Sequence, residues 1–198
     1  MRKLFVAFFA AVLLCGSAVA ADLYKIDPAH SSVNFSVSHM VVNTVHGRFN
    51  DFEGSIQLDQ KDITKSTVNV TIKTTSINTD NTTRDNHLRT GDFLDAQNHP
   101  TITFQSKSVE KKGDGYVAHG TLTIRGVSKD VDLLFTLKGP INVGPKSILG
   151  ADATLTINRQ DYGVSWSKSL DGGQLVVGND VKIELNVEAD KAPETASK

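Results

Sequence analysis

The six histidines are the side chains best suited to acid–base or metal chemistry in this sequence. No two of them lie three or four residues apart, so the helical zinc motif, which needs two ligands on one face, is absent. Cys15 is the one cysteine, and it falls in a leader segment outside the fold. We therefore predict no metal site and no cofactor.

His39 is the histidine best placed to meet a ligand. It continues the row Val33, Phe35 and Val37 at a spacing of two, and side chains with this spacing share one face of a strand. If that face is internal, His39 either donates to a ligand head group, binds a metal, or is an ordinary core histidine paired with a neighbour.

A second group of ionisable residues is concentrated in one short segment and comprises Arg84, Asp85, His87, Arg89 and Asp92. These side chains could line the mouth of a cavity and meet a polar head group. The alternative is structural: an arginine pairs with an aspartate and ties the segment to the rest of the fold. We favour the structural role.

None of the common catalytic motifs is present. Residues Gly139–Ser147 have the glycines and the lysine of a phosphate loop, but Pro145 precedes the lysine and no helical pattern follows. The Gly-x-Ser-x-Gly motif of serine hydrolases is absent. We predict no catalytic residues and a protein that is not an enzyme.

The dominant pattern of the chain is alternation of apolar and polar residues. Val181–Glu188 reads Val-Lys-Ile-Glu-Leu-Asn-Val-Glu, which predicts a strand with one apolar face. Residues 80–96 break this period, because Leu88, Phe93 and Leu94 have helix-like spacing, and they predict one or two short inserted helices. We predict strands at 22–27, 31–39, 47–58, 66–75, 101–112, 115–126, 129–139, 147–160 and 177–189.

Glycine and proline mark the turns between these strands. Tight hairpins are predicted at Lys112–Gly115 and Arg125–Ser128, because glycine adopts the positive φ that such turns require. Gly139–Pro145 is predicted to be a loop, since proline cannot donate a hydrogen bond within a central strand.

The first 20 residues are predicted to be a secretory signal peptide. Arg2 and Lys3 precede an apolar run, and Ala18-Val19-Ala20 is a cleavage site of small residues. Residues 21–189 then form one barrel domain, and 190–198 a flexible tail. The export signal predicts a periplasmic protein without a permanent membrane span.

The charged residues disfavour one class of partner and one class of barrel. Without Arg2 and Lys3 the chain has 19 basic and 22 acidic residues, a balance of −3 that disfavours nucleic acid. In an outer-membrane barrel with these side chains outward, Lys73, Lys182, Glu184 and Glu188 would face lipid. No girdle of aromatic residues flanks the strands either. A water-soluble barrel is predicted.

Five motifs in order along the chain resemble the YceI-like family of periplasmic, polyisoprenoid-binding proteins. They are Asp27–Ser31 with Val33–His39, Gly47–Gly54, Thr75–Thr79 with Arg84–Arg89 and Asp92–Asp95, Gly120–Val127, and Arg159–Gly163. The resemblance implies an all-β fold: a lipocalin-like antiparallel eight-stranded β-barrel with a short helical insert, whose cavity holds a long isoprenoid or similar amphiphilic lipid. It implies no established reaction.

An eight-stranded barrel is just wide enough to be filled by side chains or to hold one small ligand. The residues alone leave these two states open, and the resemblance favours the cavity. The expected ligand-binding residues are Phe35, Val37, His39, Phe49, Phe52, Val70, Ile72, Phe93, Phe104, Ile124, Leu133, Phe135 and Trp166.

Three functions remain in contention from the sequence. The leading one is a binding or carrier protein for a lipid or polyisoprenoid, acting as a monomer or a homodimer. The second is an enzyme that acts on a bound lipid through His39 or the Arg84–Asp92 cluster. The third is a structural or stress-response module with a filled core and no ligand.

Overall fold

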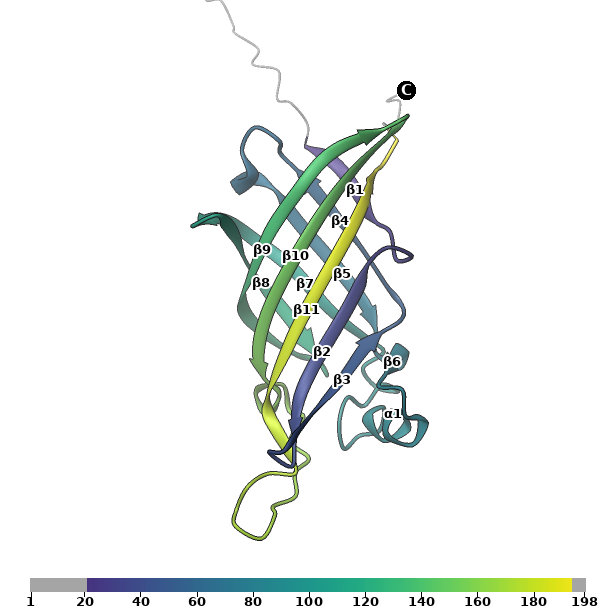
Figure 1. Cartoon of the computed structure of the whole chain (residues 1–198), viewed down its shortest axis with the longest axis vertical. Helices are drawn as coiled ribbons and strands as arrows, with labels where there is room; N and C mark the ends of the chain where they lie inside the picture. The colour runs from purple at the N-terminus through teal and green to yellow at the C-terminus, as the bar shows by residue number, and fades with distance from the viewer. Residues whose placement is uncertain (1–20, 194–198) are drawn as a thin grey trace, which may run out of the picture.

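Alternation along the chain produces an antiparallel β-barrel in the computed structural model, which describes residues 21–193 (Figure 1). One short helix, α1 (Thr82–Leu88), and three 3₁₀ turns, η1 (Ile63–Lys65), η2 (Thr74–Ser76) and η3 (Arg159–Tyr162), complete it. The strands are β1 (Asp22–Ile26), β2 (Ser32–His39), β3 (Asn43–Phe49), β4 (Phe52–Leu58), β5 (Thr67–Lys73), β6 (Ile77–Asn78), β7 (Thr101–Lys112), β8 (Gly115–Ile124), β9 (Val127–Val143), β10 (Lys146–Asn158) and β11 (Val177–Lys191).

The barrel closes where the first strand meets the last. The pairing order runs β1-β4-β5-β7-β8-β9-β10-β11, and β11 pairs again with β1, which gives eight antiparallel positions around the barrel. β1 and β2 share one position, because both pair with β11, β1 near Ala189 and β2 along the preceding part. The predicted fold class, an eight-stranded antiparallel barrel with a short helical insert, is confirmed.

The predicted strand at 47–58 is wrong as a single element. It begins earlier and divides into β3 and β4 at Asn50 and Asp51. Phe49 and Phe52 both line the interior, although residues three apart on an unbroken strand would face opposite sides. The chain therefore bends between them, and β3 pairs with β2 while β4 pairs with β1.

Both predicted hairpins are confirmed: Lys112 pairs with Gly115, and Ile124 pairs with Val127 across the turn at Arg125 and Gly126. The predicted loop at 139–145 is mostly strand, because β9 continues to Val143. The pairing of β9 with β10 shifts register between Ile148 and Gly150, so Pro140 occupies an irregularity where a ladder hydrogen bond is not required.

The helical insert between β6 and β7 contains α1 and a series of turns beside the lower end of the barrel in Figure 1. The Asn81 side chain caps α1 by accepting from the backbone N–H of Arg84 (3.0 Å). Buried Asp85 accepts from the backbone N–H and hydroxyl of Thr79 at 2.9 and 2.5 Å. The insert is thus anchored to the chain that follows β6.

The insert arginines are structural, as predicted, but their partners differ from the predicted aspartates. Arg84 donates to the hydroxyl and carbonyl of Thr79, both at 2.7 Å. Arg89 donates to the carbonyls of Thr75 and Ile77 at 2.8 and 2.7 Å. A planar guanidinium can bridge two acceptors on a neighbouring chain, and here backbone carbonyls supply them.

The predicted domain ends at 189, whereas β11 continues to Lys191. The predicted signal peptide, residues 1–20, and residues 194–198 of the predicted tail lie outside the described residues. Within residues 21–193, no helix has the length and apolar character needed to cross a membrane.

Small buried clusters pack the barrel without filling it. One end holds Tyr24, Leu58, Leu149 and Ala189, which are at most 2 % exposed. Two further clusters, around Ile102, Leu122 and Tyr162 and around Val109, Ala118 and Leu133, lie along the walls. The space that these clusters leave is the cavity described next.

Candidate functional site

A cavity of about 270 Å³ occupies the interior of the barrel. Residues from each of the strands β1 to β11, from the helical insert and from the segment after η3 line it. Eleven of the predicted ligand-binding residues are among them, namely Phe35, Val37, Phe49, Phe52, Val70, Ile72, Phe93, Phe104, Ile124, Leu133 and Phe135.

Two glycines leave space for aromatic rings in the cavity lining. Phe35 of β2 pairs with Gly47 of β3, and a Cβ atom at Gly47 would lie 2.3 Å from Cζ of Phe35. A Cβ atom at Gly120 of β8 would lie 2.6 Å from Cζ of Phe104 in β7. Glycine at these positions lets each ring lie across the neighbouring strand.

The cavity wall is almost entirely hydrocarbon. Its polar members among the described residues are Asn34, Ser66, Thr67, Tyr162 and Arg159, and none of its lining residues is a carboxylate, imidazole or thiol. Desolvating a polar ligand in such a site would not be offset by hydrogen bonds, whereas an apolar chain gains from burial. The site is therefore suited to hold a hydrocarbon.

Arg159 is the charged residue in the cavity wall, and sequence reasoning missed it as a site residue. It is 5 % exposed and donates five hydrogen bonds: to the carbonyls of Val164 (2.6 Å), Trp166 (2.8 Å), Gly178 (2.8 Å) and Val177 (3.3 Å), and to Oδ1 of Asn179 (3.3 Å). Burial lowers the pKa of the guanidinium.

All five N–H donors of Arg159 are thus engaged by the chain that leads into β11. The residue holds this segment at the lower end of the barrel rather than offering a donor to a ligand. The signal that could have found it is the row Leu155, Ile157 and Arg159, whose spacing of two places Arg159 on the inward face of the chain.

Three aromatic rings join the insert to the segment after η3. Phe93 lines the cavity, and its ring lies 5.2 Å from Trp166 and 5.0 Å from His87, centroid to centroid. His87 and Trp166 are 5.5 Å apart, and Lys168 Nζ lies 6.0 Å from the Trp166 ring. Trp166 does not itself line the cavity. Its ring packs against Phe93, which does.

His39 also lies outside the cavity lining. It is the last residue of β2, opposite Asn43 and Val177, and it is half-buried. The inward row that begins at Val33 contributes Phe35 and Val37 to the cavity and ends before His39. Contact of His39 or Trp166 with a ligand stays a prediction.

The amino-acid sequence is similar to those of known proteins. Residues 24–189 match the YceI-like domain. Protein YceI of Escherichia coli O6:H1 is 46 % identical over 134 residues, which cover 67 % of this chain and 70 % of that protein.

Solved structures share the same architecture. The YCEI protein of Campylobacter jejuni is 32 % identical, with a TM-score of 0.68 over 79 % of this chain and 90 % of that one. A polyisoprenoid binding domain from Saccharophagus degradans, implicated in plant cell wall breakdown, is 18 % identical, with a TM-score of 0.60 over 86 % of this chain and 98 % of that one. The second likeness is one of fold.

Proposed function

Because this chain belongs to the YceI-like family and encloses an apolar cavity, we propose that it binds an amphiphilic lipid with a long isoprenoid-like chain inside the barrel. A fold neighbour described as a polyisoprenoid binding domain supports this choice of ligand class. The lipid tail would lie along the hydrocarbon wall, where each buried CH₂ contributes about 0.8 kcal/mol.

The cavity of about 270 Å³ is the observation that carries the proposal. Since one water takes up roughly 30 Å³ in the liquid, the space would admit on the order of ten waters. Those waters would find few hydrogen-bonding partners in the wall, so an apolar ligand is the favoured content. The third hypothesis from the sequence, a structural or stress-response module, assumes a filled core and does not account for this space.

The same wall supports binding rather than catalysis. An enzyme acting on the lipid would need an acid or base at the cavity, and His39 lies outside the lining. The Arg84–Asp92 segment contributes Leu88 to the lining, whereas Arg84 and Arg89 donate to the backbone carbonyls of Thr79 and Ile77. The function is therefore proposed as storage or transport of the lipid, by a monomer or a homodimer.

Filling the cavity tests the proposal. Ala153 lines the cavity from β10, and Thr156 lies on the exposed face of the same strand. Ala153→Phe places a ring in the space that the lipid would occupy, and Ala153→Leu fills it with less strain. Thr156→Phe is the matched control, since it adds the same ring outside.

Native mass spectrometry of each protein, purified from its own host, measures the bound lipid. The wild-type protein and Thr156→Phe should carry a lipid with an isoprenoid-like chain, and both Ala153 variants should carry less. Equal lipid content in all four proteins, or an empty wild-type protein, would contradict the proposal.

A periplasmic location is part of the proposal and depends on the predicted signal peptide. The secreted chain should begin at Ala21 and carry no diacyl group on Cys15, because Leu14 does not suit a lipoprotein signal. The intact mass of protein recovered from the periplasmic fraction measures both features. A mass that retains residues 1–20 would count against export.

A further inference from the structure

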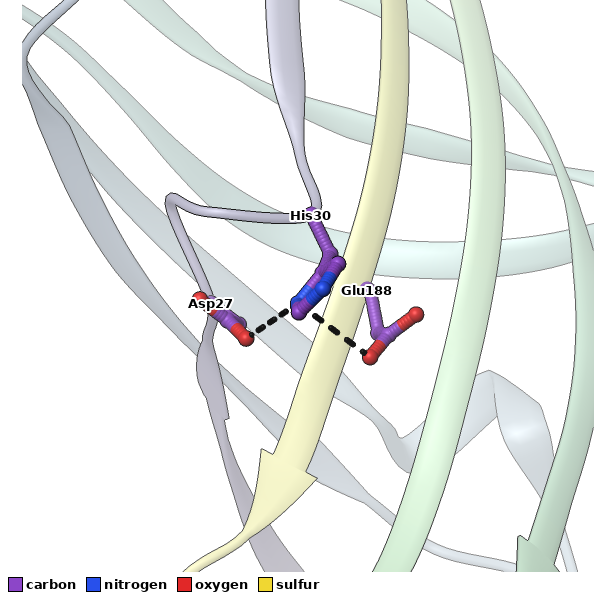
Figure 2. Close-up of side chains that lie close together, drawn as sticks. All are labelled: Asp27, His30 and Glu188. Atoms are coloured by element: carbon purple, nitrogen blue, oxygen red, sulfur yellow. Dashed lines mark hydrogen bonds and ion pairs between the residues drawn. The ribbon is translucent and has the colours of Figure 1, made fainter.

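Three potential metal ligands converge on the outer surface where β1 passes into β2. Asp27 and His30 lie in the loop between these strands, and Glu188 lies on β11 beside them (Figure 2). Nδ1 of His30 is 2.8 Å from Oδ2 of Asp27 and 3.8 Å from Oε1 of Glu188. The three ligand atoms all lie within 4.8 Å of one another.

Backbone contacts hold this loop against β11. The Ala29 N–H donates to Oδ1 of Asp27 at 2.8 Å, which leaves Oδ2 directed at His30. The hydroxyl of Ser31 donates to the Glu188 carbonyl at 3.1 Å and accepts from the Glu188 N–H at 2.9 Å. The loop and Glu188 are therefore fixed relative to each other before any ion is present.

The Asp27–His30–Glu188 cluster lies on the outer face of the barrel wall. Its neighbour Val187 lines the cavity, and successive side chains of a strand point to opposite faces. The proposed lipid site therefore does not account for these three residues.

His119 provides an instructive contrast. It also approaches two carboxylates, but Asp132 lies 2.7 Å from its Nδ1, and Glu110 lies 3.4 Å from its Nε2. Two carboxylates at different nitrogens of one ring cannot share one ion with that ring. In the Asp27–His30–Glu188 cluster, both carboxylates approach Nδ1, so one ion could contact all three ligands.

From this geometry we propose that Asp27, His30 and Glu188 bind a divalent transition-metal ion such as Zn²⁺ on the outside of the barrel. Ligands about 2.0–2.1 Å from a tetrahedral ion lie about 3.3–3.4 Å apart. The two distances to Nδ1 of His30 lie on either side of that value.

One imidazole and two carboxylates form a ligand set that zinc accepts, with water completing the coordination. The His30 side chain is 66 % exposed, which leaves room for that water. On binding, the ion takes the place of any proton on Nδ1, and this proton passes to solvent. The ammonium of Lys146 lies near enough to act on Asp27 electrostatically, but it is itself paired with Asp190 at 3.0 Å.

The site spans the closing seam of the barrel. β1 and β11 pair through three residue pairs only, Tyr24–Lys191, Lys25–Asp190 and Ile26–Ala189. An ion held by the loop after β1 and by Glu188 of β11 would connect the two sides of this seam. Because it binds the folded chain, it raises the melting temperature.

The test uses the mature chain after treatment with a chelator and dialysis. Isothermal titration with ZnCl₂ near neutral pH should show one ion bound to the wild-type protein. Affinity should fall about tenfold or more in His30→Ala, and also in Asp27→Asn and Glu188→Gln, which keep the shape of each side chain. The matched control, His119→Ala, should bind as the wild type does.

Melting temperatures provide the second measurement. Zn²⁺ should raise that of the wild type and of His119→Ala, and it should leave that of His30→Ala unchanged. Absence of binding to the wild type, or wild-type affinity in His30→Ala, would overturn the proposal. Lipid content should be the same in His30→Ala as in the wild type, so this proposal and the proposed function can fail separately.

Discussion

At the scale of single residues, Arg159 shows how a buried charge can be accommodated without a carboxylate partner in the described chain. Four carbonyl oxygens and one amide oxygen surround its guanidinium. Each carbonyl presents a partial negative charge, and hydrogen bonds to a charged donor contribute more than neutral ones. The arrangement links the end of β10 to the chain that enters β11.

Replacing Arg159 should therefore destabilise the fold. Arg159→Met keeps part of the side-chain volume but leaves buried carbonyls without donors, and we expect a loss of roughly 3 kcal/mol. Urea unfolding measures this loss. Arg48→Met is the control: Arg48 pairs with Asp80 on the surface, and we expect a loss of about 1 kcal/mol or less. Equal losses in the two variants would contradict the role assigned to Arg159.

His119 should make stability depend on pH. Its hydrogen bond to Asp132, together with the charges of Asp132 and Glu110, raises the pKa of the imidazole above its usual 6.5. The raised pKa stabilises the fold fully below the unfolded pKa, and this contribution is lost as pH rises through the folded pKa. His119→Gln should therefore lower the melting temperature more at about pH 5.5 than at about pH 8.5.

The control for this pH dependence is His46→Gln. His46 lies on the exposed face of β3, and residues 21–193 provide it with no ion pair in the structure. Its effect on the melting temperature should be nearly the same at the two pH values. A pH-independent effect of His119→Gln would remove the role assigned to its carboxylate partners.

At the scale of the elements, the packing of β2 against β3 depends on Gly47. The Phe35 ring occupies the place that a side chain at Gly47 would need, and it lies 5.7 Å from the Phe49 ring. These two rings form part of the cavity wall, so the pairing of β2 with β3 helps to set the shape of the cavity.

A single methyl group should disturb this packing. Gly47→Ala should cost about 1–3 kcal/mol, because Phe35 must leave its position and move within the barrel. Gly91→Ala is the control, since a Cβ atom there meets nothing within 4 Å. Thermal unfolding measures both variants. If Gly47→Ala were as stable as Gly91→Ala, the Phe35 ring could move aside with no loss of stability, which would contradict this prediction.

Most strands could be predicted because alternation is a local property of the sequence. The bend between β3 and β4 also leaves a local signal: Phe49 and Phe52 can share a face only if the period of two is broken between them. The partners of Arg84 and Arg89 could not be predicted, because they are backbone carbonyls, which have no residue-specific pattern. The loop predicted around Pro140 was mostly wrong, because the register shift between β9 and β10 allows a proline within the strand.

At the scale of the whole molecule, the pattern of residues could not predict whether the barrel is hollow. The same apolar residues line a cavity or fill a core, and the outcome depends on the summed volume of side chains from every strand. The cluster of Asp27 and His30 with Glu188 is equally invisible in the sequence, because Glu188 lies far along the chain from the other two residues. Only the closure of the barrel brings them together.

A ligand in the cavity should stabilise the whole barrel. A lipid at a hundredfold excess over its dissociation constant adds about 2.7 kcal/mol. For a domain of this size, that corresponds to a rise of about 5–10 °C in melting temperature. Calorimetry of delipidated protein, before and after lipid is restored, measures it. Thr156→Phe should show the full rise and Ala153→Phe a smaller one, and equal rises would place the lipid outside the barrel.

The pairing of the first strands with the last one also governs when folding can finish. The Ser31 hydroxyl bonds to Glu188, 157 residues later, and β11 pairs with β1 and β2, so closure of the barrel depends on non-local contacts that form slowly. Until β11 is made, the outer edges of β10 and β2 lack their partner, and open edges recruit strands from other chains. A chain ending before Val177 should therefore aggregate rather than persist as a shortened barrel.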